Sequence, residues 1–180
     1  MPFALEVALD PDSAAVVRAT WRDLAAAGFP FMAQSGVAPH VSLVIWDDID
    51  VAAMSAAVAT WSRDVAEVAI VFDRVAFFPT TGVVFLAPIA DSALRGMQAR
   101  CHRDLAAHGR QPWCHYAPDV WLPHCTLAQD IEGSVALARA HAIAERVPLP
   151  IAGRLSRAEL VRFHPVHCLT AVPLANSVSE

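Results

Sequence analysis

The sequence predicts an α+β protein, a single domain with two similar halves, and three observations support this. Hydrophobic residues make up 56% of the 180 positions and charged residues 17%, so the chain can bury a large core. Strand and helix patterns alternate along its length. The order of these patterns then occurs a second time, with matching residues. We therefore expect residues 1–180 to form one bilobal domain with an internal duplication.

The first half of the chain starts with a strand and then alternates helices with strands. Its predicted strands cover residues 3–9, 41–46, 68–78 and 83–86. The first helix starts at Asp10 and Asp12 and stops at Gly28, because aspartate favours helix starts and glycine favours helix ends. Asp50 begins a second helix, and the Pro-Thr-Thr-Gly turn at residues 79–82 joins the last two strands.

The second half repeats this order. Asp91 opens a helix that stops at Gly109, and a loop through residues 111–122 leads to the next strand. We expect Ser134 to cap the following helix, which is rich in alanine and ends before Pro148. The last predicted elements are a strand pair at residues 149–163 and 166–172.

Matching residues mark the repeat. The matched pairs are Asp12 with Asp91, Arg22 with Arg103, His40 with His124, and Pro79 with Pro165, at offsets of 79, 81, 84 and 86 residues. The offset grows steadily, as small loop insertions would make it grow. A duplication related by a pseudo-two-fold axis explains this pattern, and its period is far longer than that of solenoid repeats.

One short motif occurs in both halves, as Pro-His-Val-Ser-Leu at residues 39–43 and Pro-His-Cys-Thr-Leu at residues 123–127. Side chains alternate between the two faces of a strand, so the histidine and the hydroxyl residue share one face while the apolar residues face the core. The residues on the shared face are His40 and Ser42 in the first copy and His124 and Thr126 in the second. If both strands face one cleft, they form a site with two histidines and two hydroxyls.

Such a site suits the opening of a cyclic phosphodiester. The reaction needs a base that takes a proton from water and an acid that protonates the leaving oxygen, and histidine can do either near neutral pH. Ser42 and Thr126 can donate hydrogen bonds to the phosphate oxygens. No metal is needed for this scheme. The similarity of the two halves leaves open whether His40 or His124 is the acid.

The paired motifs, with Trp121-Leu122-Pro123 leading into the second, resemble the two-histidine phosphoesterase superfamily, which includes 2′-5′ RNA ligase-like proteins and cyclic nucleotide phosphodiesterases. The resemblance covers almost the whole chain. It implies two lobes of antiparallel sheet with outer helices and a central cleft. It also implies a phosphoesterase without a cofactor, with His40 and His124 as acid and base and Ser42 and Thr126 as phosphate-binding residues. Many relatives carry a basic residue just after the second motif, where this chain has Ala128-Gln129-Asp130.

The formal charge of −5 argues against a long nucleic acid as partner, because proteins that grip phosphate backbones usually carry a basic surface. We expect a small nucleotide or an RNA terminus as substrate, formed or cleaved at a 2′,3′-cyclic or 2′-5′ bond. Phe78, Tyr116 and Trp121 are candidates for stacking the base at the edge of the cleft, and core packing is the alternative for each.

No membrane segment is expected, and no secretory signal, because Glu6 and Asp10 interrupt the apolar N-terminal stretch. The four cysteines are spaced unlike a compact disulfide framework, which favours reduced thiols and a cytoplasmic protein. Each cysteine has a histidine neighbour, but neighbours on a strand face opposite ways and no spacing matches a zinc motif, so no metal site is predicted.

Two other interpretations compete with the enzyme. Two histidines that follow prolines can be ordinary core residues, although the hydroxyl two positions after each of them argues against this. A non-catalytic nucleotide- or phosphate-binding module of the same fold is the second alternative, and the missing basic residue after the second motif favours it.

Overall fold

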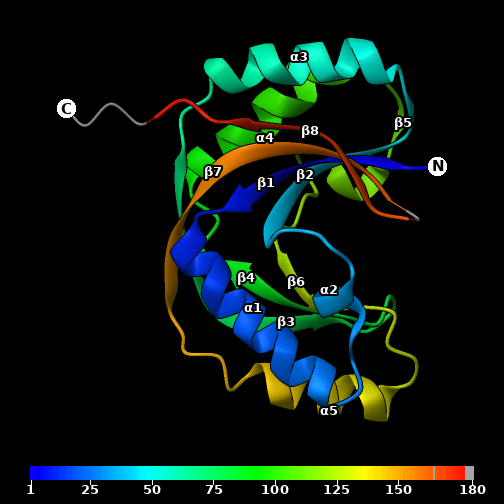
Figure 1. Cartoon of the computed structure of the whole chain (residues 1–180), viewed down its shortest axis with the longest axis vertical. Coiled ribbons are helices and arrows are strands. Elements are labelled where there is room, and N and C mark those ends of the chain that lie inside the picture. The colour runs from blue at the N-terminus through cyan, green and yellow to red at the C-terminus, as the bar shows by residue number, and fades with distance from the viewer. Residues whose placement is uncertain (164, 177–180) are drawn as a thin grey trace.

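The computed structural model describes residues 1–163 and 165–176. It forms one antiparallel sheet of eight strands with five α-helices and two short 3₁₀ helices, η1 and η2 (Figure 1). The strands are β1 (Phe3–Leu9), β2 (His40–Ile49), β3 (Val68–Phe78), β4 (Val83–Pro88), β5 (Gly109–Pro112), β6 (Cys125–Ala128), β7 (Ile151–Arg162) and β8 (His167–Pro173). The helices are α1 (Pro11–Ala26), α2 (Phe31–Gln34), α3 (Val51–Arg63), α4 (Ser92–Leu105), η1 (Ala106–His108), η2 (Cys114–Tyr116) and α5 (Ser134–Ala144). The predicted α+β class is confirmed.

Three of the helices begin where the sequence predicts, each after an aspartate. The Asp10, Asp50 and Asp91 carboxylates accept hydrogen bonds from backbone N–H groups of the first turns of α1, α3 and α4. The expected cap at Ser134 is wrong. The N-cap of α5 is Gly133, whose φ of +85° suits glycine, and Ser134 is already the first helical residue.

Two short elements were not predicted: α2 lies between the first helix and the first motif strand, where no element was assigned, and β5 overlaps the start of the predicted loop. Helix α2 has four residues, too few to show a helical period. Strand β5 is polar and mostly exposed, and it forms only because it pairs with the edge of β2, where Trp46 lies opposite Pro112. The predicted loop through residues 111–122 is therefore wrong at its start.

Two matching series of three strands run outward from the centre of the sheet, one in each direction. Its order is β5-β2-β1-β7-β3-β4-β6, with β8 beside β7. The series β7-β1-β2 therefore matches β3-β4-β6. Strand β1 precedes helix α1 and pairs with β7, and β4 precedes helix α4 and pairs with β3. We propose that this arrangement reflects the duplication predicted from the sequence.

The helices cover the two parts of the sheet in the same crossed manner. In Figure 1, α3 and α4 lie at one end of the molecule and α1 and α5 at the other. Helix α4 contacts β2, and α1 contacts β6, so each motif strand is supported by a helix from the other half of the chain. Among the described residues, no helix is long and apolar enough to cross a membrane.

One apolar core joins the two parts and buries the back of both motif strands. Val41 and Leu43 of β2, and Cys125 and Leu127 of β6, are at most 1% exposed and belong to the same cluster. Burying a leucine side chain is worth about 1.5–3 kcal/mol, so these residues hold the two strands against the core. The opposite faces of the strands are left for the site, as the alternation in the motif predicts.

Candidate active site

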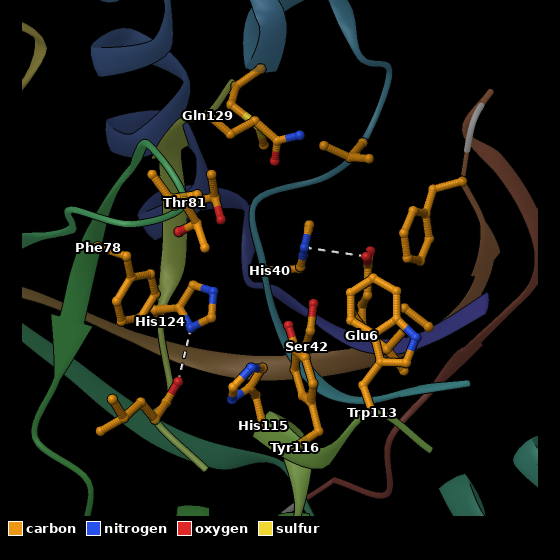
Figure 2. Close-up of a pocket in the computed structure, with 18 of the residues that line it drawn as sticks. Glu6, His40, Ser42, Phe78, Thr81, Trp113, His115, Tyr116, His124 and Gln129 are labelled. Atoms are coloured by element: carbon orange, nitrogen blue, oxygen red, sulfur yellow. Dashed lines mark hydrogen bonds and ion pairs between the residues drawn. The ribbon is translucent and has the colours of Figure 1, made fainter. Parts of the chain in front are cut away.

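A pocket of about 590 Å³ opens between the two motif strands (Figure 2). Strands β2 and β6 contribute to it together with β1, the β3–β4 turn and the segment that contains η2. All the residues named from the sequence line it: His40, Ser42, Phe78, Tyr116, Trp121, His124 and Thr126. The fold therefore gathers two motifs that are far apart in the sequence around one cavity.

Each motif strand carries a β-bulge directly after its hydroxyl residue. The pairing of β1 with β2 passes from Ser42 to Val44 and skips Leu43, and the pairing of β4 with β6 passes from Thr126 to Ala128 and skips Leu127. Bulges redirect side chains and often lie beside active sites. Here the two bulges are at matching places in the repeat, and both place a leucine into the core.

Both imidazoles are oriented by the same backbone contact. His40 Nδ1 lies 2.7 Å from the Ala38 carbonyl oxygen, and His124 Nδ1 lies 2.8 Å from that of Leu122. A carbonyl oxygen only accepts, so in both rings Nδ1 carries the hydrogen. The accepting residue precedes a proline, which restricts its backbone to extended conformations. The backbone therefore engages Nδ1 of each ring, and Nε2 is the nitrogen that remains for other contacts.

The surroundings of the two rings differ. His40 Nε2 lies 3.3 Å from Oε1 of Glu6, a buried carboxylate on β1. His124 packs against Phe78 and Phe85, with ring centroids 5.3 Å away in each case. Burial lowers the pKa of His124 and the charge of His40 lowers it further, although the hydrogen bond to Leu122 raises it. The lowered pKa favours the neutral form of His124 at neutral pH, and the Nε2 lone pair of that form can accept a proton.

Burial acts on two other groups near His40. The pKa of Glu6 is raised by burial and by the nearby charge of Glu159, while His40 lowers it. The pKa of Tyr116 is raised to about 12, by burial and by the charge of Glu6, against a hydrogen bond with Ser42 that lowers it. The Tyr116 phenol therefore stays protonated at neutral pH and is a donor at the pocket wall.

Two tryptophans hold the motif strands by their backbones. Trp121 Nε1 donates to the Ser42 carbonyl oxygen at 3.1 Å, and Trp21 Nε1 donates to that of Thr126 at 3.0 Å. Both indoles are buried, with exposed fractions of 2% and 4%. Little of the Trp121 ring is therefore open to a ligand. Phe78 is half-buried and stacks on Phe85 with ring centroids 4.3 Å apart.

A family model for the 2′-5′ RNA ligase superfamily matches residues 10–166. The chain belongs to this superfamily. The resemblance inferred from the paired motifs is thereby confirmed. Among curated protein sequences, none matches the chain.

Solved structures of this superfamily's fold superpose on nearly the whole chain. A phosphoesterase crystal structure has a TM-score of 0.62 and covers 97% of this chain and 98% of its own. Escherichia coli LigT has a TM-score of 0.60 with coverages of 97% and 99%, and TT0787 of Thermus thermophilus has 0.59 with 99% and 100%. Each is 16% identical to this chain, a level at which the likeness concerns the fold. LigT is also known in complexes with 3′-AMP and with phosphate.

The pocket lining carries little positive charge. None of its described lining residues is an arginine or lysine, and two of them, Glu6 and Asp130, are acidic. Asp130 stands in the segment after the second motif, and its φ is +58°. The described residues also contain no group of three or more His, Cys, Asp or Glu side chains that could hold a metal ion.

Sequence reasoning missed several residues of the pocket. Glu6 was visible as the charged residue in an otherwise apolar strand, but nothing local connects it with His40. Trp113 and Phe163 meet edge to face, with ring centroids 6.1 Å apart, and line the wall formed with Ile45 and Val161. No motif marks these residues, because they come from separate segments that only the sheet brings together.

Proposed function

We propose that this superfamily member is a metal-independent phosphoesterase that hydrolyses, or in the reverse direction forms, 2′,3′-cyclic or 2′-5′ phosphodiester bonds. His40 and His124 act as acid and base, and Ser42 and Thr126 bind the phosphate. One observation carries the proposal. From matching positions of two strands, both imidazoles present Nε2 at one pocket while a backbone carbonyl holds Nδ1.

In hydrolysis, one Nε2 takes a proton from water as the water oxygen bonds to phosphorus. The bond from phosphorus to the 2′ or 3′ oxygen breaks, and the second imidazole gives that oxygen its proton. Ligation reverses these steps, with a ribose hydroxyl in place of water. The hydroxyls of Ser42 and Thr126 donate to the non-bridging oxygens, where negative charge develops. The protonated Tyr116 phenol, beside Ser42, supplies a further donor.

The charge of the pocket supports a small substrate with few phosphates. A long nucleic acid is held by many phosphate contacts with basic side chains, and the described lining residues provide none. A nucleoside 2′,3′-cyclic phosphate carries one negative charge and needs only the donors described above. The complexes of LigT with 3′-AMP and phosphate agree with a small ligand or an RNA end. Phe78 and Tyr116 are the proposed contacts for the base, and the cytoplasm is the proposed location.

The test is incubation of the purified protein with each 2′,3′-cyclic mononucleotide in the presence of a chelator. We expect ring opening to a nucleoside monophosphate at a rate that the chelator does not change. His40→Ala and His124→Ala serve as inactive controls. Binding of the cyclic nucleotide without turnover would instead support a non-catalytic module, and loss of activity on chelation would show that a metal takes part.

A further inference from the structure

The outer edge of the first motif strand is held by other groups where no strand covers it. Strand β5 pairs with β2 only from Trp46 onward, so in the described part of the chain the start of β2 has β1 as its one strand partner. Three N–H groups donate to backbone carbonyl oxygens of this stretch. They are Trp121 Nε1 to Ser42 at 3.1 Å, Gln98 Nε2 to Leu43 at 3.1 Å, and the Trp113 backbone N–H to Ile45 at 2.8 Å.

Gln98 joins this edge to a second segment. Its Nε2 lies 3.1 Å from the Leu43 carbonyl oxygen and 2.7 Å from the carbonyl oxygen of Tyr116, the last residue of η2. An amide nitrogen has two hydrogens, so both contacts can form at once. Leu43 is the residue that the bulge skips in the pairing of β2 with β1. The amide therefore connects the bulge of β2 directly to η2.

The position of Gln98 in α4 shows that this contact is specific. Gln98 is 1% exposed, and the other buried residues of α4 are Leu94, Met97, Cys101 and Leu105. A polar group on such a face is unfavourable unless it is hydrogen-bonded. An apolar residue would fill the same space without this requirement. What Gln98 adds to the helix is the pair of hydrogen bonds to β2 and η2.

Tyr116 is the residue that η2 brings to the pocket. Figure 2 shows its phenol pointing from η2 toward Ser42, with which it shares a hydrogen bond. Helix η2 has three residues, and such short 3₁₀ turns have poor hydrogen-bond geometry of their own. The direction of the Tyr116 side chain therefore depends on contacts from outside η2, and the Gln98 amide binds the backbone of Tyr116 itself.

We propose that Gln98 is a positioning residue that fixes η2 to the bulge of β2 and thereby holds the Tyr116 phenol beside Ser42 as a phosphate donor. This inference rests on the proposed function. Gln98 is not among the described lining residues of the pocket, so it acts through Tyr116 and not on the substrate. A donor that is already in place stabilises the charge developing on a phosphate oxygen without reorganisation during the reaction.

The first test follows the phenol directly. Tyr116 is the only tyrosine in the chain, so the ultraviolet absorbance of phenolate reports on this residue alone. Gln98→Met keeps a long, unbranched side chain and removes both N–H groups. The wild-type phenol should titrate at a pKa of about 12, because it is buried and lies near the charge of Glu6. In a folded Gln98→Met the phenol becomes more exposed, and we expect its pKa to fall toward the ordinary value of about 10.

The second test measures kcat with a cyclic mononucleotide. Tyr116→Phe removes the phenol and keeps the backbone carbonyl that Gln98 binds. We expect it to lower kcat by about 10–10²-fold, somewhat less than the loss of a main oxyanion donor, and Gln98→Met to lower kcat by a similar or smaller factor. The double variant should be no slower than Tyr116→Phe, because Gln98 acts through the phenol. A double variant slowed by the product of the two factors would overturn the inference.

Trp21→Phe is the matched control. It also removes a buried N–H donor from a backbone carbonyl of a motif strand, at Thr126 of β6, and it should also lower stability. Its phenol should titrate as in the wild type. Loss of stability alone therefore does not reproduce the result expected for Gln98→Met.

A folded Gln98→Met whose phenol titrates as in the wild type would overturn the inference and leave the phosphoesterase proposal standing. If Gln98→Met does not fold, Gln98→Asn replaces it. Its amide lies one CH₂ group closer to the helix, and its phenol should shift in the same direction. A wild-type protein that binds the cyclic nucleotide but never turns it over would overturn the proposed function, and the inference with it.

Discussion

Replacing Trp121 with phenylalanine separates two roles for this ring, a support for β2 and a platform for the base. The indole is 2% exposed and donates to the Ser42 carbonyl oxygen at 3.1 Å. Phenylalanine keeps an aromatic face but has no N–H group. If the ring is a support, the substitution lowers stability and leaves nucleotide binding nearly unchanged.

The magnitude follows from what is removed. Leaving a buried carbonyl oxygen without its donor costs about 1–3 kcal/mol. The smaller ring buries less apolar surface, which adds roughly 1 kcal/mol at about 25 cal/mol per Å². We therefore expect Trp121→Phe to lower the free energy of unfolding by about 2–4 kcal/mol. For a chain of this size that corresponds to a fall in Tm of about 5–15 °C.

Urea unfolding measures this loss, provided that the slope m is the same in the variant and the wild type. The KM for a cyclic mononucleotide measures the binding role. Trp21→Phe is the matched control, because its indole makes the same contact with the Thr126 carbonyl oxygen at 3.0 Å, from outside the pocket lining. The two variants should lose similar stability. Unchanged stability in Trp121→Phe, with KM raised about fivefold or more as expected for a lost base stack, would refute the supporting role.

Three further predictions concern the site and its frame. His40→Ala and His124→Ala should each lower kcat by about 10²–10⁴-fold, and the double variant much less than the product, because the pair acts as a unit; full activity in either would contradict the mechanism. Gly82→Ala should cost about 1–3 kcal/mol in urea unfolding, since at φ +63° its Cβ would lie 2.2 Å from the Ile131 carbonyl oxygen, whereas Gly36→Ala, with nothing within 4 Å, should cost less. Burial lowers the pKa of His124, so as pH falls below about 6.5 the unfolded chain takes up a proton on this histidine before the folded chain does, and stability falls. This fall should be smaller in a folded His124→Gln than in the wild type. Equal slopes of stability against pH in the two proteins would argue that His124 is not buried as a neutral ring.

Local patterns determined much of the fold and the outline of the site. Alternation along a strand was enough to place His40 with Ser42, and His124 with Thr126, on the side away from the core. The residue between the two members of each pair is buried, as this alternation requires. Aspartates located the starts of α1, α3 and α4, since a cap acts within one helical turn. The repeat of the motif pointed to the superfamily, because both copies kept the same residue types at the same spacing.

The tertiary structure alone decided what surrounds each histidine. Glu6 reaches His40 only through the register of β1 with β2, which the bulge at Leu43 sets, and neither is readable from composition or period. Trp21 supports Thr126 because α1 crosses to the other part of the sheet, and β5 exists only through its pairing with β2. These contacts join residues that are distant in sequence, and their energies depend on packing and burial in the completed fold rather than on local conformational preference. The sequence accounts for the likeness of the two motif strands, and the contacts formed in the fold account for the different surroundings of the two histidines.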